Sequence, residues 1–325
     1  MYGPRILVKV PASTANLGPG FDTLGMALSL FEWIEMQAAD ETTITAYGKG
    51  MKDIPSDKSN LIYKVAQLVF EEAGVSVPEL SISLYCEIPL TRGLGSSASA
   101  IVGALVAANA LIGSPLSDDK LFQIATKLEG HPDNVGASMF GGIVVSAWDG
   151  ERADHVRIEP HPSLETLVAI PSFQLSTEKA RHALPKTLNM ADAVFNVGRS
   201  SLLVAALSAG RLDLIRTAMR DRLHQPYRAQ LIPGMSSILA NASEHGALGA
   251  ALSGAGPTII TFVDGSSSAS SKAELERFLL DTLAAEGIEA ETMWLPPYQH
   301  GAVWTKLDEH DKTPLMDLIR SEVRA

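Results

Sequence analysis

The stretch that decides the fold is PLTRGLGSSASA, residues 89–100. Before it, residues 80–88 alternate apolar and polar side chains, which predicts a strand with one buried face. After it, residues 98–110 combine alanines with Ile, Val and Leu, which predicts a buried helix. Strand, glycine loop and helix in this order bring unpaired backbone N–H groups and a helix N-terminus together, and such a site binds anions. The sequence therefore predicts a phosphate-binding loop.

From the loop alone, two other interpretations stay open. Gly93-x-Gly95-x-x-Ala98 fits a relaxed dinucleotide-binding fingerprint, which would indicate a nicotinamide-dependent oxidoreductase. That fingerprint requires an acidic residue about twenty positions later, at the end of a second strand, whereas Asp118 and Asp119 fall in a predicted loop. The other interpretation is a tight turn whose small residues only allow close packing. A P-loop is excluded, because no Lys follows either glycine.

Composition limits the class of protein. The chain has 325 residues, 46% of them hydrophobic, which is enough for two domains or for one large domain. A net charge of −11 argues against nucleic-acid and anionic-membrane partners, which require a basic face. No run of eighteen apolar residues and no signal peptide occurs, so we expect a cytoplasmic protein. The single Cys86 excludes a disulfide framework and a cysteine-rich metal site, and its position predicts a core residue.

The organisation predicted is α/β with two domains. Composition shifts at residues 148–152, which we take as the boundary region. We expect an N-terminal domain over residues 1–155 and a C-terminal domain over residues 156–325, with a charged tail from about residue 307.

Polar residues gather in two further loops. Residues 11–22 are dense in turn formers, and Asn16 and Asp22 are placed among apolar anchors that would pin the loop to the core. Residues 129–134, EGHPDN, put four functional groups at a helix break. For His131, loop packing is favoured over metal binding, since no second His or Cys stands at ligand spacing.

Other candidates have simple structural interpretations beside functional ones. Asp133 and Asn134 are equally well explained as turn formers, and Asn60 as the N-cap of the helix that follows it. The densest basic group in this acidic chain includes Arg228 and could be a solvated face. Residues 250–258 form a second small-residue loop, where backbone could approach a ligand closely.

Three of these loops together resemble the three motifs of the GHMP small-molecule kinases: residues 11–22, 89–98 and 252–258. Within that superfamily the chain resembles the homoserine kinases, through residues 16–22, 129–134 and 225–234. The resemblance extends from Ile6 to about Leu295.

The resemblance implies a fold and a reaction. The fold is the two-domain α/β (α+β) GHMP kinase fold, whose N-terminal domain is similar to the second domain of ribosomal protein S5 and whose C-terminal domain is ferredoxin-like. The reaction is ATP-dependent phosphorylation of the side-chain hydroxyl of L-homoserine to O-phospho-L-homoserine, on the way to threonine. ATP and substrate would bind between the domains, Mg²⁺ would be the metal cofactor, and a homodimer is expected.

The resemblance also implies residue roles. The catalytic residues would be Ser97, Glu129 and Asn134, of which Ser97 and Glu129 would hold Mg²⁺. Residues surrounding the amino acid would be Asn16, Asp22, Asn134, Thr177, Arg181 and Arg228. Residues near ATP would be Asn60 at the adenine and, at the phosphates, Pro89, Arg92, Gly93, Leu94, Gly95, Ser96, Ser97, Ala98, Ser99, Gly256 and Thr258.

The chain departs from related kinases at two places. Relatives carry an aspartate base where this chain has Asn134, an amide that cannot take a proton, and Asp133 stands one position away. Without an alignment gap, Gln123 rather than Glu129 would take the metal position. We expect Glu129, because a carboxylate binds Mg²⁺ better than an amide.

Two rival functions have the same fold. One is a GHMP kinase acting on mevalonate or a sugar, which the two arginines oppose because they suit a carboxylate substrate. The other is a catalytically silent relative that binds a ligand, which would be expected to lose the glycine loop or Glu129.

Overall fold

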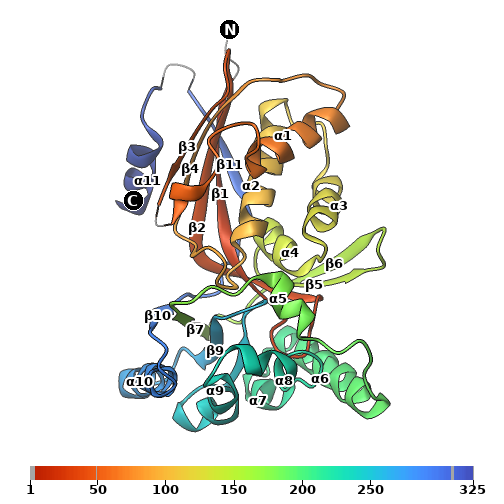
Figure 1. The fold of residues 1–325 in the computed structure, drawn as a ribbon, viewed down its shortest axis with the longest axis vertical. Coiled ribbons are helices and arrows are strands. Elements are labelled where there is room, and N and C mark those ends of the chain that lie inside the picture. Colours follow the sequence, from red (N-terminus) through yellow and green to blue (C-terminus); the bar gives the residue numbers. More distant parts are fainter. Residues whose placement is uncertain (1–3, 49, 309–310, 325) are drawn as a thin grey trace.

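The computed structural model describes residues 4–48, 50–308 and 311–324. Figure 1 shows two α/β units joined end to end, each built on one sheet. They are called the first layer and the second layer below, after the first and the second sheet. The first sheet runs in the order β11-β1-β2-β4-β3, with β5 pairing to β2 and β6 pairing to β5. Its strands are β1 (Arg5–Ala15), β2 (Leu24–Ala38), β3 (Thr43–Tyr47), β4 (Leu80–Cys86), β5 (Ile143–Trp148), β6 (Ala153–Ile158) and β11 (Val303–Leu307).

Helices cover one face of the first sheet and bury its apolar side chains. They are α1 (Leu61–Glu72), α2 (Ser96–Leu111), α3 (Asp118–Glu129) and α4 (Asp133–Phe140). In β4 every second residue is buried, as the alternation predicted, and α2 buries most of its residues against β1 and β2. The predicted strand and helix around the glycine loop are therefore confirmed.

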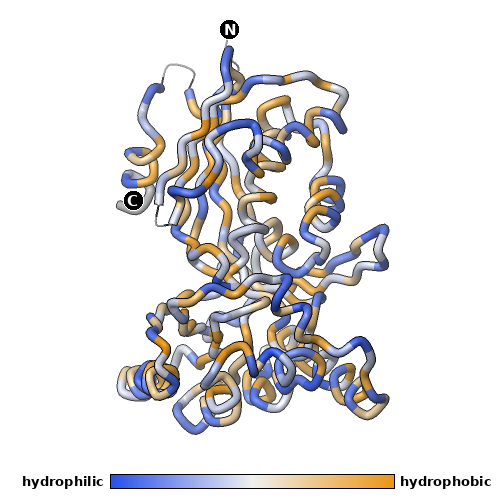
Figure 2. The backbone as a smooth tube through the Cα atoms, viewed as in Figure 1, coloured by the Kyte–Doolittle hydropathy of each residue, from blue (hydrophilic) through white to orange (hydrophobic). Residues whose placement is uncertain are grey.

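The second sheet is antiparallel, in the order β10-β7-β9-β8. Its strands are β7 (Leu164–Pro171), β8 (Gly249–Leu252), β9 (Ile259–Asp264) and β10 (Ala290–Trp294). Its helices are α5 (Thr177–His182), α6 (Met190–Ser208), α7 (Ile215–Ala218), α8 (Gln225–Arg228), α9 (Met235–Asn241) and α10 (Ala269–Ala285). Surface helices such as α3 and α10 alternate polar and apolar positions, as Figure 2 shows.

The chain does not divide at residues 148–152. These residues join β5 to β6, which pair antiparallel within the first sheet, so the composition shift marks a hairpin turn. The chain passes to the second sheet between Ile158 and Leu164. The proposed boundary near residue 155 thus falls inside β6.

The chain returns to the first sheet before the expected charged tail, and the tail itself, from about residue 307, contains a helix. β11 pairs antiparallel with β1, and α11 (Leu315–Arg324) packs Leu315 and Ile319 against Trp33 on the face opposite α2. β11 left little signal in the sequence, because backbone hydrogen bonds hold it to β1 while the side chains of Val303 and Trp304 stay about half exposed.

Two other elements differ from the expected loops. β1 continues to Ala15, with an irregularity in its pairing with β2 between Pro11 and Ala12. Its pairing with β11 ends at Lys9. The N–H that Pro11 lacks therefore removes no hydrogen bond to β11. Residues after Pro132 form α4, which is almost fully buried, instead of a loop.

Among the described residues, one helix, α6, is long and apolar enough to cross a membrane by length and composition alone. A single such helix is weak evidence, because helices of globular proteins pass the same test. α6 buries Leu203 and Leu207 in the larger of the hydrophobic clusters, which also contains the apolar side chains of the first sheet.

Candidate active site

The glycine loop leaves the N-terminus of α2 open. Gly95 caps α2 at φ 74° without a side-chain hydrogen bond. Asn60, Ser117 and Ser176, by contrast, cap α1, α3 and α5 with side chains that accept from backbone N–H groups. The first N–H groups of α2 are therefore not covered by a cap and can bind an anion.

Both glycines of the loop are required by close backbone packing. A Cβ at Gly95 would lie 2.1 Å from Oγ of Ser13, and one at Gly93 would lie 2.3 Å from the carbonyl oxygen of Ser253. Both have positive φ, at 74° and 81°. The loop is thus wedged between β1 and the second glycine loop, which fixes its position in the molecule.

A cavity of about 130 Å³ lies between the two layers, directly in front of the glycine loop. Its walls come from all three motif loops, from the residues after α3, and from α5 and α8. The predicted site residues that line it are Asn16, Asp22, Gly93, Gly95, Ser96, Ser97, Glu129, Asn134, Thr177, Arg181, Arg228 and Gly256.

Ser97 and Glu129 meet at one edge of the cavity. Oγ of Ser97 donates to Oε2 of Glu129 at 3.0 Å. Gln123 lies elsewhere, since its amide exchanges two hydrogen bonds of 2.8 Å with the backbone of Ala153 in β6. A hydroxyl and a carboxylate side by side offer two hard oxygen ligands.

Asn134 and Asn16 are fixed by the loops that they face. Nδ2 of Asn134 donates to Oγ of Ser13 at 3.0 Å. Nδ2 of Asn16 donates to the carbonyl oxygen of Gly254 at 2.9 Å, and its Oδ1 accepts from the backbone N–H of Asp22 at 3.0 Å. Asn16 therefore ties the first motif to the second glycine loop.

Arg181 and Arg228 approach the cavity differently. Arg181 pairs with Asp22 through contacts of 2.9 and 3.0 Å, and both side chains are about one third exposed. Arg228 is buried and donates to the carbonyl oxygens of Ala180 at 3.2 Å and Gly254 at 3.0 Å. Burial, together with the nearby charge of Arg181, lowers the pKa of Arg228 to about 10. Arg228 is thus held in place, whereas Arg181 is partly open to solvent.

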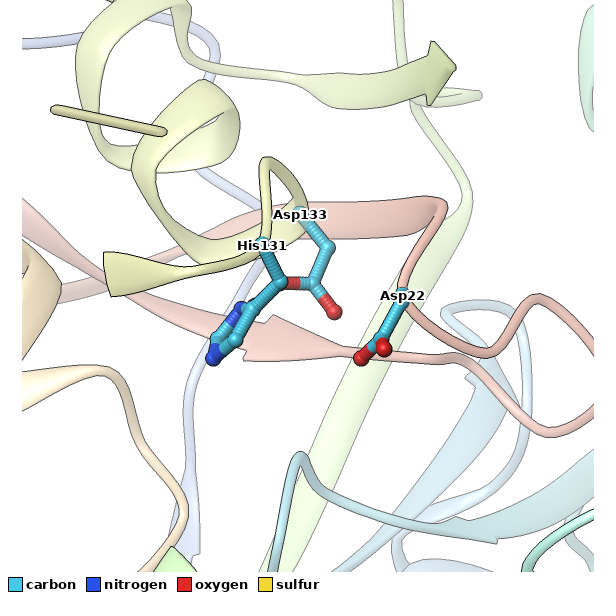
Figure 3. Close-up of side chains that lie close together, drawn as sticks. All are labelled: Asp22, His131 and Asp133. Carbon is cyan, nitrogen blue, oxygen red and sulfur yellow. Dashed lines mark hydrogen bonds and ion pairs between the residues drawn. The ribbon is translucent and has the colours of Figure 1, made fainter. Parts of the chain in front are cut away.

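His131 lies in the cavity wall beside Asp133, and the side chain of Asp22 lies close to both (Figure 3). Nδ1 of His131 donates to Oδ1 of Asp133 at 2.6 Å, and the same oxygen accepts from the backbone N–H of Asn134 at 2.7 Å. Burial lowers the pKa of His131, but the hydrogen bond and charge of Asp133, with the charges of Glu129 and Asp22, raise it by more, so the net shift is upward. Favouring plain loop packing for His131 therefore missed its place in the cavity wall.

One oxygen or nitrogen from each of Asp22, His131 and Asp133 lies within 4.8 Å of the other two, a spacing that could hold a cation. Asp22, however, already pairs with Arg181, and Asp133 already accepts from His131 and a backbone N–H. The carboxylates of this cluster are therefore already paired with Arg181 and His131, so they do not require a bound cation.

The remaining predicted residues do not line the cavity. Asn60 caps α1, where its Oδ1 accepts from the backbone N–H of Ile62 at 2.8 Å. Arg92 reaches across to the carbonyl oxygen of Ser172 at 2.7 Å, joining the glycine loop to the second layer. Thr258 is fully buried with its hydroxyl unpartnered. The others in this group are Pro89, Leu94, Ala98 and Ser99.

Comparison with known proteins identifies the family. Residues 60–142 match the family "GHMP kinases N terminal domain", and residues 203–279 match "GHMP kinases C terminal". The chain is 47% identical over 297 residues to homoserine kinase of Moorella thermoacetica, covering 91% of this chain and 99% of that protein. It is 44% identical over 296 residues to homoserine kinase of Deinococcus radiodurans, covering 91% and 95%.

Solved structures agree. Homoserine kinase from Cytophaga hutchinsonii superposes with a TM-score of 0.82 at 27% identity, covering 93% of this chain and 98% of that one. A mevalonate kinase from L. major shares the fold alone, with a TM-score of 0.62 at 17% identity over 92% and 96% of the two chains. The chain belongs to the homoserine kinases of the GHMP kinase family.

Proposed function

We propose that this protein transfers the γ-phosphate of ATP to the side-chain hydroxyl of L-homoserine, giving O-phospho-L-homoserine for threonine biosynthesis. The observation that carries the proposal is one cavity that joins an uncapped helix N-terminus on one side to arginine side chains on the other. Phosphoryl transfer requires positioning and charge neutralisation rather than covalent chemistry, and this cavity supplies both.

The ATP phosphates bind at the N-terminus of α2. Backbone N–H groups of residues 93–97 contact phosphate oxygens, and the helix dipole stabilises their charge. Gly256 comes from the second glycine loop and closes the other side of the same cavity. Arg92 and Thr258 do not line the cavity. Arg92 holds the glycine loop to the carbonyl oxygen of Ser172.

Mg²⁺ fits beside the phosphates. Ser97 and Glu129 already place a hydroxyl and a carboxylate oxygen 3.0 Å apart at the cavity edge, and hard oxygen donors of this kind suit Mg²⁺. The ion would neutralise negative charge on the phosphates. Glu129 rather than Gln123 is the metal ligand in this proposal, since Gln123 is engaged with Ala153.

Homoserine binds at the opposite wall. Its carboxylate suits the guanidinium groups of Arg181 and Arg228, and its ammonium suits Asp22. Asn16 and Thr177 complete the wall beside these charges.

No side chain needs to act as a strong base. Asn134 orients the hydroxyl toward the phosphate, and the proton leaves late, to the transferring phosphate or to water. Asp133 acts indirectly, since its carboxylate holds His131 and the first turn of α4.

An assay of ADP release tests the assignment. Purified protein with Mg²⁺ and ATP is offered L-homoserine, mevalonate and galactose in parallel. We expect turnover with homoserine alone. Turnover with mevalonate or galactose would support another GHMP kinase, and ATP binding without turnover of any of the three would support a silent relative.

We further propose a cytoplasmic homodimer without nucleic-acid or membrane partners. Three exposed apolar side chains on one side of α6, Met190, Val194 and Val197, are 78%, 63% and 68% exposed and offer a surface for a second copy. Light scattering on wild type and on Val194→Glu tests this, and a dimer that persists in the variant would place the interface elsewhere.

A further inference from the structure

A buried acid lies directly behind the phosphate-binding loop. Glu32 on β2 is only 2% exposed. It pairs in the sheet with Val10 of β1 and Cys86 of β4, both of which are buried core residues. A carboxyl group at such a core position is costly unless it is neutral or hydrogen-bonded, so its presence needs an explanation.

The partner of Glu32 belongs to the first turn of α2. Oε2 of Glu32 lies 2.6 Å from Oγ of Ser99, and the same Oγ lies 3.0 Å from the carbonyl oxygen of Ser96. Ser96 begins α2 and lines the cavity. Glu32 is therefore two hydrogen bonds away from the loop that faces the phosphates.

Ser99 has one hydroxyl proton and can donate it to only one of these two oxygens. Both contacts can be hydrogen bonds only if Glu32 carries a proton of its own. A neutral Glu32 donates to Oγ of Ser99, and Ser99 then donates to the carbonyl oxygen of Ser96, so both distances are hydrogen bonds. An ionised Glu32 can only accept, so the Ser99 hydroxyl donates to Glu32 instead and its hydrogen bond to the carbonyl oxygen of Ser96 is lost. The neutral acid thus joins the sheet to the first turn of α2.

Burial favours the neutral form of Glu32. Burial raises the pKa of Glu32 from 4.5 to about 7, and the hydrogen bond from Ser99 only partly offsets this. The neighbouring titratable groups are the Cys86 thiol and the Glu87 carboxyl, both with raised pKa, and Lys9 of β1, which lies 4.3 Å from the ring centroid of Phe31. α2 itself contains no titratable side chain.

We propose that Glu32 is a positioning residue for the phosphate-binding loop: as a neutral acid it holds the first turn of α2 through Ser99, and loss of its proton weakens nucleotide binding. Ionisation both breaks the contact to Ser96 and puts a negative charge behind the N–H groups that receive phosphate. The inference rests on the proposed ATP site. By linkage, nucleotide binding should also draw a proton onto Glu32.

The test compares Glu32→Gln with wild type in titrations with Mg²⁺ and ADP at pH 6 and pH 8.5. The glutamine amide donates to Ser99 as the neutral acid does, at every pH. We expect the ratio of wild-type to variant Kd to rise on the order of fivefold between the two pH values. The titration of the nucleotide itself is common to both proteins and cancels in the ratio.

Two further variants sharpen the result. Ser99→Ala keeps the carboxyl but removes the connection, and it should weaken ADP binding at pH 6 and raise the KM for ATP more than it lowers kcat. Glu87→Gln, a nearby carboxyl that accepts from the backbone N–H of Phe31, should keep the wild-type pH dependence.

A constant Kd ratio across pH, or normal ADP binding by Ser99→Ala, would overturn the inference. Failure of wild type to bind ADP at either pH would instead overturn the proposed ATP site. Ser99→Ala decides the matter if Glu32→Gln does not fold.

Discussion

The guanidinium of Arg181 holds the carboxylate of Asp22 with two hydrogen bonds, at 2.9 and 3.0 Å, across the cavity between the two layers. Asp22 follows β1 in the first layer and Arg181 lies on α5 in the second. These two charges are complementary to the two ends of a zwitterionic amino acid. Because both side chains are about one third exposed, the ion pair can be separated at modest cost in free energy. The carboxylate of an amino acid can then pair with Arg181 and its ammonium with Asp22.

Arg181→Lys should reduce kcat/KM for homoserine roughly 10²-fold or more, because a lysine cannot reproduce the bidentate contact with a carboxylate. The melting temperature should hardly change, since Arg181 is partly exposed. Steady-state kinetics with homoserine and with its amino-alcohol analogue check this, and the defect should shrink with the analogue. Arg211→Lys, at an exposed arginine that contacts Asp213, is the matched control. An equal defect with both substrates would place Arg181 away from the carboxylate.

Arg228→Lys should lose activity and stability together. The buried guanidinium holds the backbone of Ala180 and Gly254, and a lysine leaves at least one of these carbonyl oxygens without its donor. We expect a lower melting temperature in addition to a raised KM for homoserine. Normal stability in this variant would contradict a role in joining the two loops.

Gly95→Val should abolish nucleotide binding in a folded protein. The added side chain meets Oγ of Ser13 and occupies the N-terminus of α2, where phosphate would lie. Gly113→Ala is the control, since Gly113 also has positive φ, at 88°, but an added Cβ there meets nothing within 4 Å. Calorimetric titration with ADP should show binding in Gly113→Ala alone. Retained binding in Gly95→Val would refute the assignment of the phosphate site.

Stability should respond to pH through Glu32. Its pKa of about 7 in the folded protein lies above the ordinary 4.5, so the folded state binds this proton more tightly than the unfolded state. The resulting stabilisation is complete below about pH 4.5 and is lost as the pH rises through 7, by about 3 kcal/mol in all. Urea unfolding at pH 5 and pH 8 should show Glu32→Gln gaining on wild type at the higher pH. Parallel changes in the two proteins would mean that Glu32 keeps one charge state throughout.

Local patterns predicted the elements around the glycine loop, but contacts between distant segments left no local signal. The alternation in residues 80–88 and the alanine-rich run after it depend only on neighbours in sequence, and both elements formed as expected. Asp22 and Arg181 are 159 positions apart, so their pairing follows from the packing of the two layers. β11 is held by backbone bonds to β1, which its side chains do not encode.

The candidate site residues also divide into those that a local sequence pattern indicates and those that depend on a contact in the folded structure. Glycine spacing indicated the loop that lines the cavity, and a helix break indicated Glu129 and Asn134, which line the same cavity. The sequence does not reveal the place of His131 in the cavity wall, because that place depends on its hydrogen bond to Asp133, which reads as a turn former or a base. A His two residues before an Asp, at a break that opens a buried helix, was the available signal.

Variants of Glu129 and Gln123 test which of the two residues binds the metal. Glu129→Gln should cut kcat by 10²-fold or more while changing homoserine affinity little, because the change removes the only carboxylate proposed as a metal ligand. Gln123→Ala should leave kcat near wild type, since that amide contacts Ala153 in β6. Initial rates over a series of Mg²⁺ concentrations check both. A severe loss in Gln123→Ala alone would move the metal site.

The absence of a base can be tested at Asp133 and Asn134. The Oδ1 atom of Asp133 is already engaged by His131 at 2.6 Å and by the backbone N–H of Asn134 at 2.7 Å, so it is not positioned as a free proton acceptor. Asp133→Asn should therefore lose less than about tenfold in kcat, below the 10² to 10⁴ typical of a general base. A turn former would give the same mild loss, so this variant alone does not establish how the hydroxyl is held.

Asn134→Ala separates these cases. If the amide orients the substrate hydroxyl, the KM for homoserine should rise while ATP binding stays normal; if Asn134 only shapes the turn, KM should not change. Ser138→Ala is the matched control, because Ser138 contacts the same Ser13 hydroxyl, at 3.2 Å, from the same helix but does not line the cavity. A severe kcat loss in folded Asp133→Asn with normal ATP binding would instead make Asp133 the base, and the proton would then leave early rather than late.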